Sequence, residues 1–129
     1  MIKKRKIGFT GPFADVNFGD YAMVVNNIYD LEIDDIVLFS YDSPFLNAIK
    51  EDYLSDFNID IIDVKFKDNF NIVEESKDRI LTPIDILHNL SNYDEISFVM
   101  NDLDVLVVNG GGYFNSLWSM PHRIERLAK

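Results

Sequence analysis

The sequence of 129 residues contains no cysteine, and its 12 basic side chains are outnumbered by 22 acidic ones, for a formal net charge of −10. The absence of cysteine excludes a disulfide framework, a thiolate zinc site and a catalytic thiol, and it agrees with a reducing compartment. Nucleic-acid binding depends on Lys and Arg neutralising phosphates, so the acidic balance argues against a DNA- or RNA-binding domain. We therefore expect a cytoplasmic protein whose partners are neutral or cationic.

Long apolar runs are also missing. No stretch approaches the roughly 18 apolar residues that cross a bilayer, so the chain is not expected to span a membrane. The basic start, residues 1–6, is followed by too short an apolar run for a signal peptide. With 47% hydrophobic and 13% aromatic residues, the chain can nevertheless bury the core of a single domain.

Short apolar runs rich in β-branched residues alternate with longer amphipathic segments. This alternation is typical of βαβ units and predicts an α/β domain with a mainly parallel sheet of about four or five strands. The fourth run, Val-Leu-Val-Val, suits a strand buried on both faces. The predicted strands are 6–10, 36–39, 59–64 and 105–108.

The segments between these strands predict the helices. A crossover helix is expected over 21–29 with Asp20 as its N-cap, and Pro44 opens a second helix. Pro83 begins a third helical stretch with a break near 91–92. The apolar residues expected to face the core from the second and third stretches are Phe45, Ile49, Tyr53, Leu54, Phe57, Ile84, Leu87, Leu90, Ile96, Val99 and Met100.

Two further segments complete the prediction. Residues 65–79 are polar and are expected to form a loop. Residues 120–129 are expected to be helical, and no strand follows them, although a crossover helix normally returns the chain to the sheet. We therefore expect residues 1–129 to form a single domain that is the N-terminal part of a longer, two-domain chain.

Two glycine-bearing loops follow predicted strands, one over 10–20 and one over 109–115. If the strand order is 3-2-1-4, both loops flank the crevice where ligands bind in open parallel sheets. Neither loop carries the closely spaced glycines of a dinucleotide site or a Walker lysine. A carboxylate at the start of the first helix would repel a second anion, so the first loop is expected to contact hydroxyl groups.

The chemistry of these loops has more than one interpretation. Asp20 and Asn17 can accept hydrogen bonds from sugar hydroxyls, and Asp20 can serve as a general base. Their alternative roles are a helix cap and a turn former. The N–H groups of Gly110, Gly111 and Gly112 can form an anion-binding concavity before a helix near Asn115, or these glycines can form a tight turn.

Together, Asn17-Phe18-Gly19-Asp20 and Val107–Gly112 resemble the motifs of the polysaccharide pyruvyl transferase family. The resemblance implies the N-terminal, Rossmann-like three-layer domain of a two-domain GT-B-like enzyme for cell-envelope polysaccharide. Such an enzyme moves pyruvate from phosphoenolpyruvate onto a saccharide acceptor as a ketal. We expect no cofactor and no metal. With the chemistry of the two loops, this gives as candidate site residues Asp20 for catalysis and Asn17, Gly19, Gly110, Gly111, Gly112 and Asn115 for substrate binding.

Cations for the donor carboxylate and phosphate are scarce in this chain, since His122, Arg123 and Arg126, past the second loop, are the only basic residues expected near the crevice. We therefore expect a C-terminal domain to hold the donor, and residues 1–129 to be inactive alone. Two alternatives remain: the acceptor domain of a GT-B sugar-nucleotide glycosyltransferase, and a non-catalytic binding domain. His88 and His122 lie too far apart in sequence for a metal-ligand pattern and are expected to be packed or at the surface.

Overall fold

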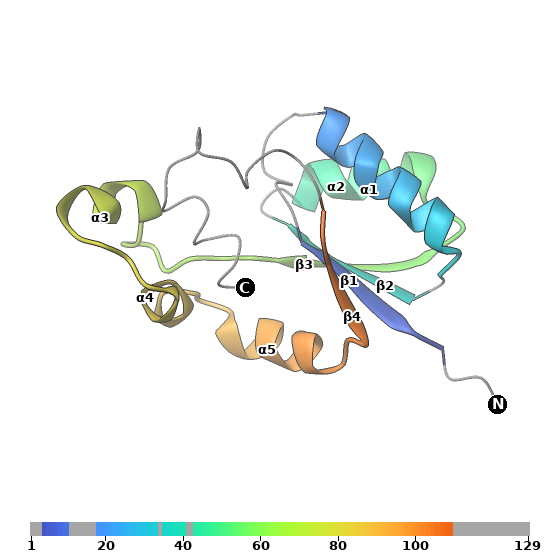
Figure 1. The fold of residues 1–129 in the computed structure, drawn as a ribbon. Coiled ribbons are helices and arrows are strands. Elements are labelled where there is room, and N and C mark those ends of the chain that lie inside the picture. Colours follow the sequence, from blue (N-terminus) through green and yellow to red (C-terminus); the bar gives the residue numbers. More distant parts are fainter. Residues whose placement is uncertain (1–3, 11–17, 34, 41–42, 110–129) are drawn as a thin grey trace.

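The computed structural model describes residues 4–10, 18–33, 35–40 and 43–109, except the side chains of residues 18, 72, 73 and 76. This part of the chain forms a parallel sheet between two layers of helices, the Rossmann-like α/β fold that the sequence predicts (Figure 1). Its elements are β1 (Lys6–Thr10), α1 (Phe18–Leu31), β2 (Asp35–Ser40), α2 (Ser43–Tyr53), β3 (Asn58–Asp63), α3 (Ile72–Asp78), α4 (Pro83–His88), α5 (Tyr93–Asn101) and β4 (Val105–Val108).

The strand order is β3-β2-β1-β4, which meets the condition on which the predicted crevice depends. All three strand pairs are parallel, and β1 pairs with β4 up to the partners Thr10 and Val108. The helices α1 and α2 cover one face of the sheet, while α5 lies on the other (Figure 1). The carboxyl ends of β1 and β4 are therefore neighbours, which is the arrangement that creates a crevice in doubly wound sheets.

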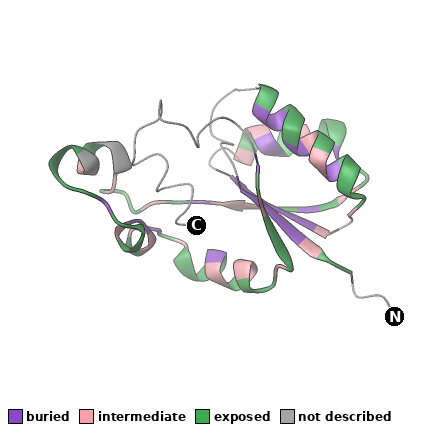
Figure 2. Ribbon diagram, viewed as in Figure 1, coloured by how far each residue is buried: buried purple, intermediate pink, exposed green. Residues whose placement is uncertain are grey.

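Alternate residues of β2 enter two separate cores, because successive side chains of a strand point to opposite faces. Leu38 belongs to the larger core, where it packs with residues of α1 and α2, among them Val24 and Leu46. Val37 and Phe39 belong to the smaller core. The other buried members of the smaller core are Val64, Leu90 and Ile96. The central strands are accordingly the most deeply buried elements (Figure 2).

The prediction that β4 is buried on both faces is wrong. Val105, Leu106 and Val108 are each at least 40% exposed. Within the described sheet, β4 is an edge strand that pairs with β1 alone. An apolar run indicates that a strand can be buried, but its actual burial depends on which elements pack against it.

The helix α3 corrects the prediction of a loop over 65–79. The Asn71 side chain accepts a hydrogen bond from the Glu74 N–H (3.1 Å), as an N-cap does. Acidic residues occupy the first turn, and Lys77 in the last turn pairs with Glu74 at 2.8 Å. Local interactions of this kind favour an exposed helix that has no long apolar stripe, which explains why periodicity alone missed it.

The α4–α5 pair confirms both the helix start at Pro83 and the break near 91–92. Thr82 and Asp85 form a reciprocal capping box at the start of α4. Hydrogen bonds from the Thr82 backbone N–H, the Arg79 guanidinium and the Thr82 hydroxyl lower the pKa of the Asp85 carboxyl below its usual value. This network fixes the direction in which α4 leaves the preceding segment.

Several predicted apolar faces are only partly correct. Leu54, Leu90 and Ile96 are buried as predicted, but Tyr53 and Ile84 are mostly exposed, at 57% and 62%. Leu46, which the prediction omitted, is the buried residue of α2. The hydroxyl of Tyr29 on α1 donates to the Tyr53 carbonyl, so this part of α2 meets its neighbour through the backbone. The helix predicted over 120–129 lies outside the described residues.

Candidate functional site

The candidate site begins where β1 and β4 end side by side. Thr10 and Val108 are partners in the parallel register. The next residue, Asn109, donates its backbone N–H to the Thr10 carbonyl at 2.7 Å, which extends the pairing by one step. The two strands that precede the predicted loops are thus joined up to their last residues, and the topology brings the two loop starts together as expected.

Asn109 connects this junction to α1. Its side chain is 1% exposed, and its Nδ2 donates to the Asp20 carbonyl at 3.3 Å. Its Oδ1 accepts from Asn27 Nδ2 at 2.9 Å. Since buried amides must satisfy both their donor and acceptor groups, these bonds fix the end of β4 against the first turns of α1.

Asp20 lies in the first turn of α1, not at the N-cap, because the helix starts two residues earlier at Phe18. The N-cap prediction is therefore wrong. Asp20 is 6% exposed, whereas Gly19 beside it is exposed. A carboxylate in the first turn is favoured by the unpaired N–H groups and the positive end of the helix dipole.

Thr10 supplies a further polar group at the end of β1. It is 2% exposed, and its Oγ1 has no hydrogen-bond partner in the described part of the chain. A buried hydroxyl without a partner costs free energy, and such groups call for a specific explanation. A hydroxyl that can both donate and accept is suited to a ligand that carries hydroxyl groups itself.

The remaining predicted site residues lie outside the described residues. These are Asn17, Gly110, Gly111, Gly112 and Asn115, and the basic residues His122, Arg123 and Arg126. The described polar groups at the junction are Thr10, Asp20, Asn27 and Asn109, and none of these four is cationic. The amides and the hydroxyl of this set can hydrogen-bond to hydroxyl groups, while a carboxylate disfavours a second anion.

Sequence reasoning identified Asp20 but gave no role to Thr10 or Asn109. Both residues border the predicted loops, and their placement at strand ends was available from the sequence. Their roles depend on burial and on contacts between residues 89 positions apart. Within the described ranges, no cluster of three or more His, Asp or Glu side chains is placed to hold a metal ion.

We expect Asn109→Ala to lower the free energy of unfolding by about 1–3 kcal/mol, because Asn27 and the Asp20 carbonyl each lose a buried partner. Urea denaturation followed by circular dichroism measures this change. Asn26→Ala is the matched control, since Asn26 is exposed on the same helix and its loss is expected to cost at most about 0.5 kcal/mol. Equal stability of the two variants would contradict a stabilising role of the Asn109 hydrogen bonds between β4 and α1.

The described residues include no helix that is both long and apolar enough to cross a membrane. Scans of this chain against protein-family models, curated proteins and solved structures return no match.

Proposed function

We propose that the junction of β1 and β4 binds the hydroxyl groups of a saccharide, and that this chain forms the acceptor side of a polysaccharide pyruvyl transferase. The observation that carries the proposal is the buried Thr10 hydroxyl, which has no partner among the described residues and stands beside Asn109 at the carboxyl ends of adjacent strands. Ligands of open parallel sheets bind at this location.

The proposed reaction makes a ketal. Two hydroxyl groups of the acceptor bond to the central carbon of phosphoenolpyruvate, whose C=C bond takes up a proton at the methylene carbon and whose C–O bond to phosphate breaks. Of the two hydroxyl protons released, one balances the proton added to the methylene carbon and the other leaves with the phosphate. A base that removes the proton of the attacking hydroxyl must lie within hydrogen-bond reach of it. Among the described residues, Asp20 is the acidic residue whose backbone contacts this junction, so its carboxylate is our candidate for that base. Its backbone is fixed by the bond from Asn109.

The described residues at the junction are not suited to bind the donor, phosphoenolpyruvate. Phosphoenolpyruvate carries a carboxylate and a phosphate, and cations stabilise both groups during transfer. Thr10, Asp20, Asn27 and Asn109 provide none. We therefore propose that a C-terminal domain holds the donor and that residues 1–129 bind the acceptor without transferring pyruvate.

A titration followed by amide NMR tests the acceptor site. The probes are methyl glycosides of the common hexoses, phosphoenolpyruvate and a sugar nucleotide, each added to the chain of residues 1–129. We expect at least one glycoside to shift the amides of Thr10, Gly19, Asp20 and Asn109, and phosphoenolpyruvate to leave them unchanged. Tight binding of the sugar nucleotide at these amides would instead favour a sugar-nucleotide glycosyltransferase.

Thr10→Val sharpens this test because it removes the hydroxyl while keeping the shape of the side chain. Glycoside binding is expected to weaken roughly fivefold to tenfold, which corresponds to one lost hydrogen bond. Stability should hold or rise, since the hydroxyl has no described partner to lose. Thr10→Ser keeps the hydroxyl and should keep binding. Unaltered binding by Thr10→Val, or pyruvyl transfer by residues 1–129 alone, would refute the proposal.

A further inference from the structure

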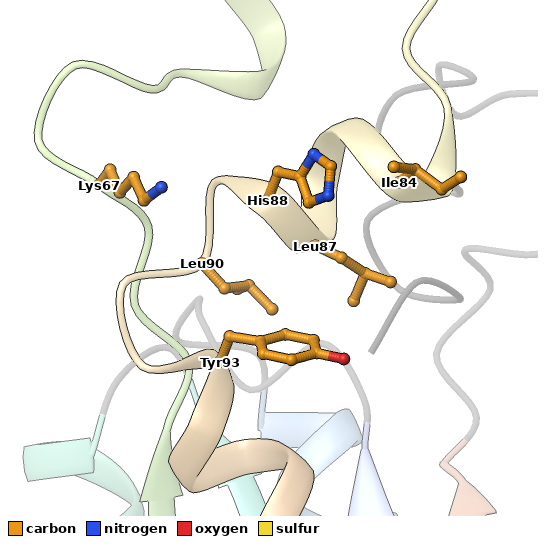
Figure 3. A pocket seen from close by; sticks show the side chains of 6 residues that line it. All are labelled: Lys67, Ile84, Leu87, His88, Leu90 and Tyr93. Atoms are coloured by element: carbon orange, nitrogen blue, oxygen red, sulfur yellow. The ribbon is translucent and has the colours of Figure 1, made fainter.

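A cavity lies on the α5 side of the sheet, against α4 and the first turn of α5 (Figure 3). Its volume is about 530 Å³, which is within the range of small-molecule sites. It is separate from the β1–β4 junction, and none of the residues proposed for saccharide binding borders it. The residues that line it are Lys67, Ile84, Leu87, His88, Leu90 and Tyr93.

The backbone around this cavity is held by hydrogen bonds between the segment after β3 and the turn that joins α4 to α5. Phe66 and Leu90 form an antiparallel bridge. The Lys67 N–H donates to the Asn89 carbonyl at 2.8 Å, and the Ser91 N–H donates to the Lys65 carbonyl at the same distance. These bonds fix both walls of the cavity in relation to each other.

The floor of the cavity is apolar. Leu90 is buried in the smaller core, while Tyr93 and Ile84 leave much of their apolar surface in water. An adjoining cavity of about 190 Å³ shares Leu87, Leu90 and Tyr93 with the first and continues along α5 to Ile96 and Met100. The apolar surface thus extends beyond the first cavity, and a ligand that covers it would gain hydrophobic free energy.

Two basic side chains border this apolar floor, although the protein is strongly acidic. The ammonium group of Lys67 is directed toward His88 (Figure 3). None of the six described residues that line the cavity is acidic. Asp85 on α4 is held by Arg79 at 3.1 Å and by Thr82. The acid closest to Lys67 in sequence, Asp68, borders a different cavity, which Lys67 also lines.

We propose that this cavity binds a small amphiphilic anion, with its apolar body on Leu87, Leu90 and Tyr93 and its single carboxylate or phosphate at Lys67 and His88. The volume of about 530 Å³ and the apolar floor accommodate the body of the ligand. Lys67 makes no ion pair within the described part of the chain, so its charge is available to an anionic group. A ligand of this kind would stabilise the α4–α5 layer by binding only the folded state.

Decanoate and decyl phosphate, below their micelle concentrations, are the probes, and decanol is the neutral control with the same apolar body. Isothermal titration and amide NMR should show binding of at least one anion at residues 84–93. Binding of decanol should be at least roughly tenfold weaker, because a charged group forms the stronger hydrogen bonds. Equal affinity for decanol, or no binding of either anion, would overturn the proposal.

Two matched pairs of variants locate the site. Ile84 and Ile80 are both exposed, at 62% and 89%, but only Ile84 lines the cavity. Ile84→Asp should weaken binding of the anion roughly tenfold or more, while Ile80→Asp should change it less than twofold. Lys67→Gln should weaken binding, whereas Lys65→Gln removes a lysine outside this cavity and should not. An equal loss within either pair contradicts the assignment, and equal unfolding midpoints exclude misfolding.

Discussion

Phe39→Ala is expected to lower the free energy of unfolding by about 3–5 kcal/mol. Phe39 is fully buried in β2 and is among the largest fully buried side chains of the described chain. It packs in the smaller core with Val37, Leu90 and Ile96. Removing the ring would leave a cavity between the sheet and α5, and would take a large part of the roughly 5–15 kcal/mol that stabilises a typical domain.

Urea denaturation of the wild-type chain and of the variant measures this loss. Phe98→Ala is the matched control, because Phe98 lies on α5 and is 79% exposed. Its replacement is expected to change stability by at most about 0.5 kcal/mol. If Phe39→Ala cost less than about 1 kcal/mol, the packing of α5 against the sheet would be disproved.

The strands could be predicted from the sequence because two independent signals agree on them, whereas their order entered the prediction only as a condition. β-branched runs mark the strands, and intervening amphipathic segments require crossover connections between parallel neighbours. The limits of β1 and β4 are as predicted, and those of β2 and β3 differ by at most one residue at each end. The helix α3 escaped prediction because its stability comes from an Asn71 cap and local charge pairs, which leave no periodic pattern.

Burial was harder to predict than secondary structure. The four apolar residues of β4 predict a strand buried on both faces, yet β4 is an edge strand in the described sheet and its side chains are largely exposed. Ile84 fits the apolar spacing of its helix, yet it borders an open cavity. In both cases the sequence indicates what a side chain prefers, while its exposure depends on which elements lie beside it.

The candidate site could likewise be predicted only in part. Asp20 was found from its place after a glycine-bearing loop, and it does lie at the β1–β4 junction. Thr10 and Asn109 were passed over because a threonine at a strand end and an asparagine before glycines are ordinary in loops. Their burial, and the bonds of Asn109 to α1, distinguish them, and these exist only once the chain is folded.

Gly8→Val is the second large effect that we expect, with a loss of about 1–3 kcal/mol in the free energy of unfolding. Gly8 is buried in β1, between β2 and β4. A Cβ at this position would lie 2.4 Å from Leu103 Cδ1, and 3.3 Å from both Leu106 Cδ1 and Phe39 Cε2. The first separation is far below van der Waals contact, so Leu103 must move, and the branched valine also presses on both other neighbours.

A double-mutant cycle with Leu103→Ala distinguishes this clash from a general weakening of the strand. Leu103 approaches Gly8 from the segment between α5 and β4, so truncating it removes the closest contact. We expect the double variant to be more stable than the sum of the single losses predicts, by about 1–2 kcal/mol. Strictly additive losses would contradict the close approach, and with it the reason that β1 carries glycine at its centre. Because valine favours strands, any destabilisation by Gly8→Val must come from packing and not from strand propensity.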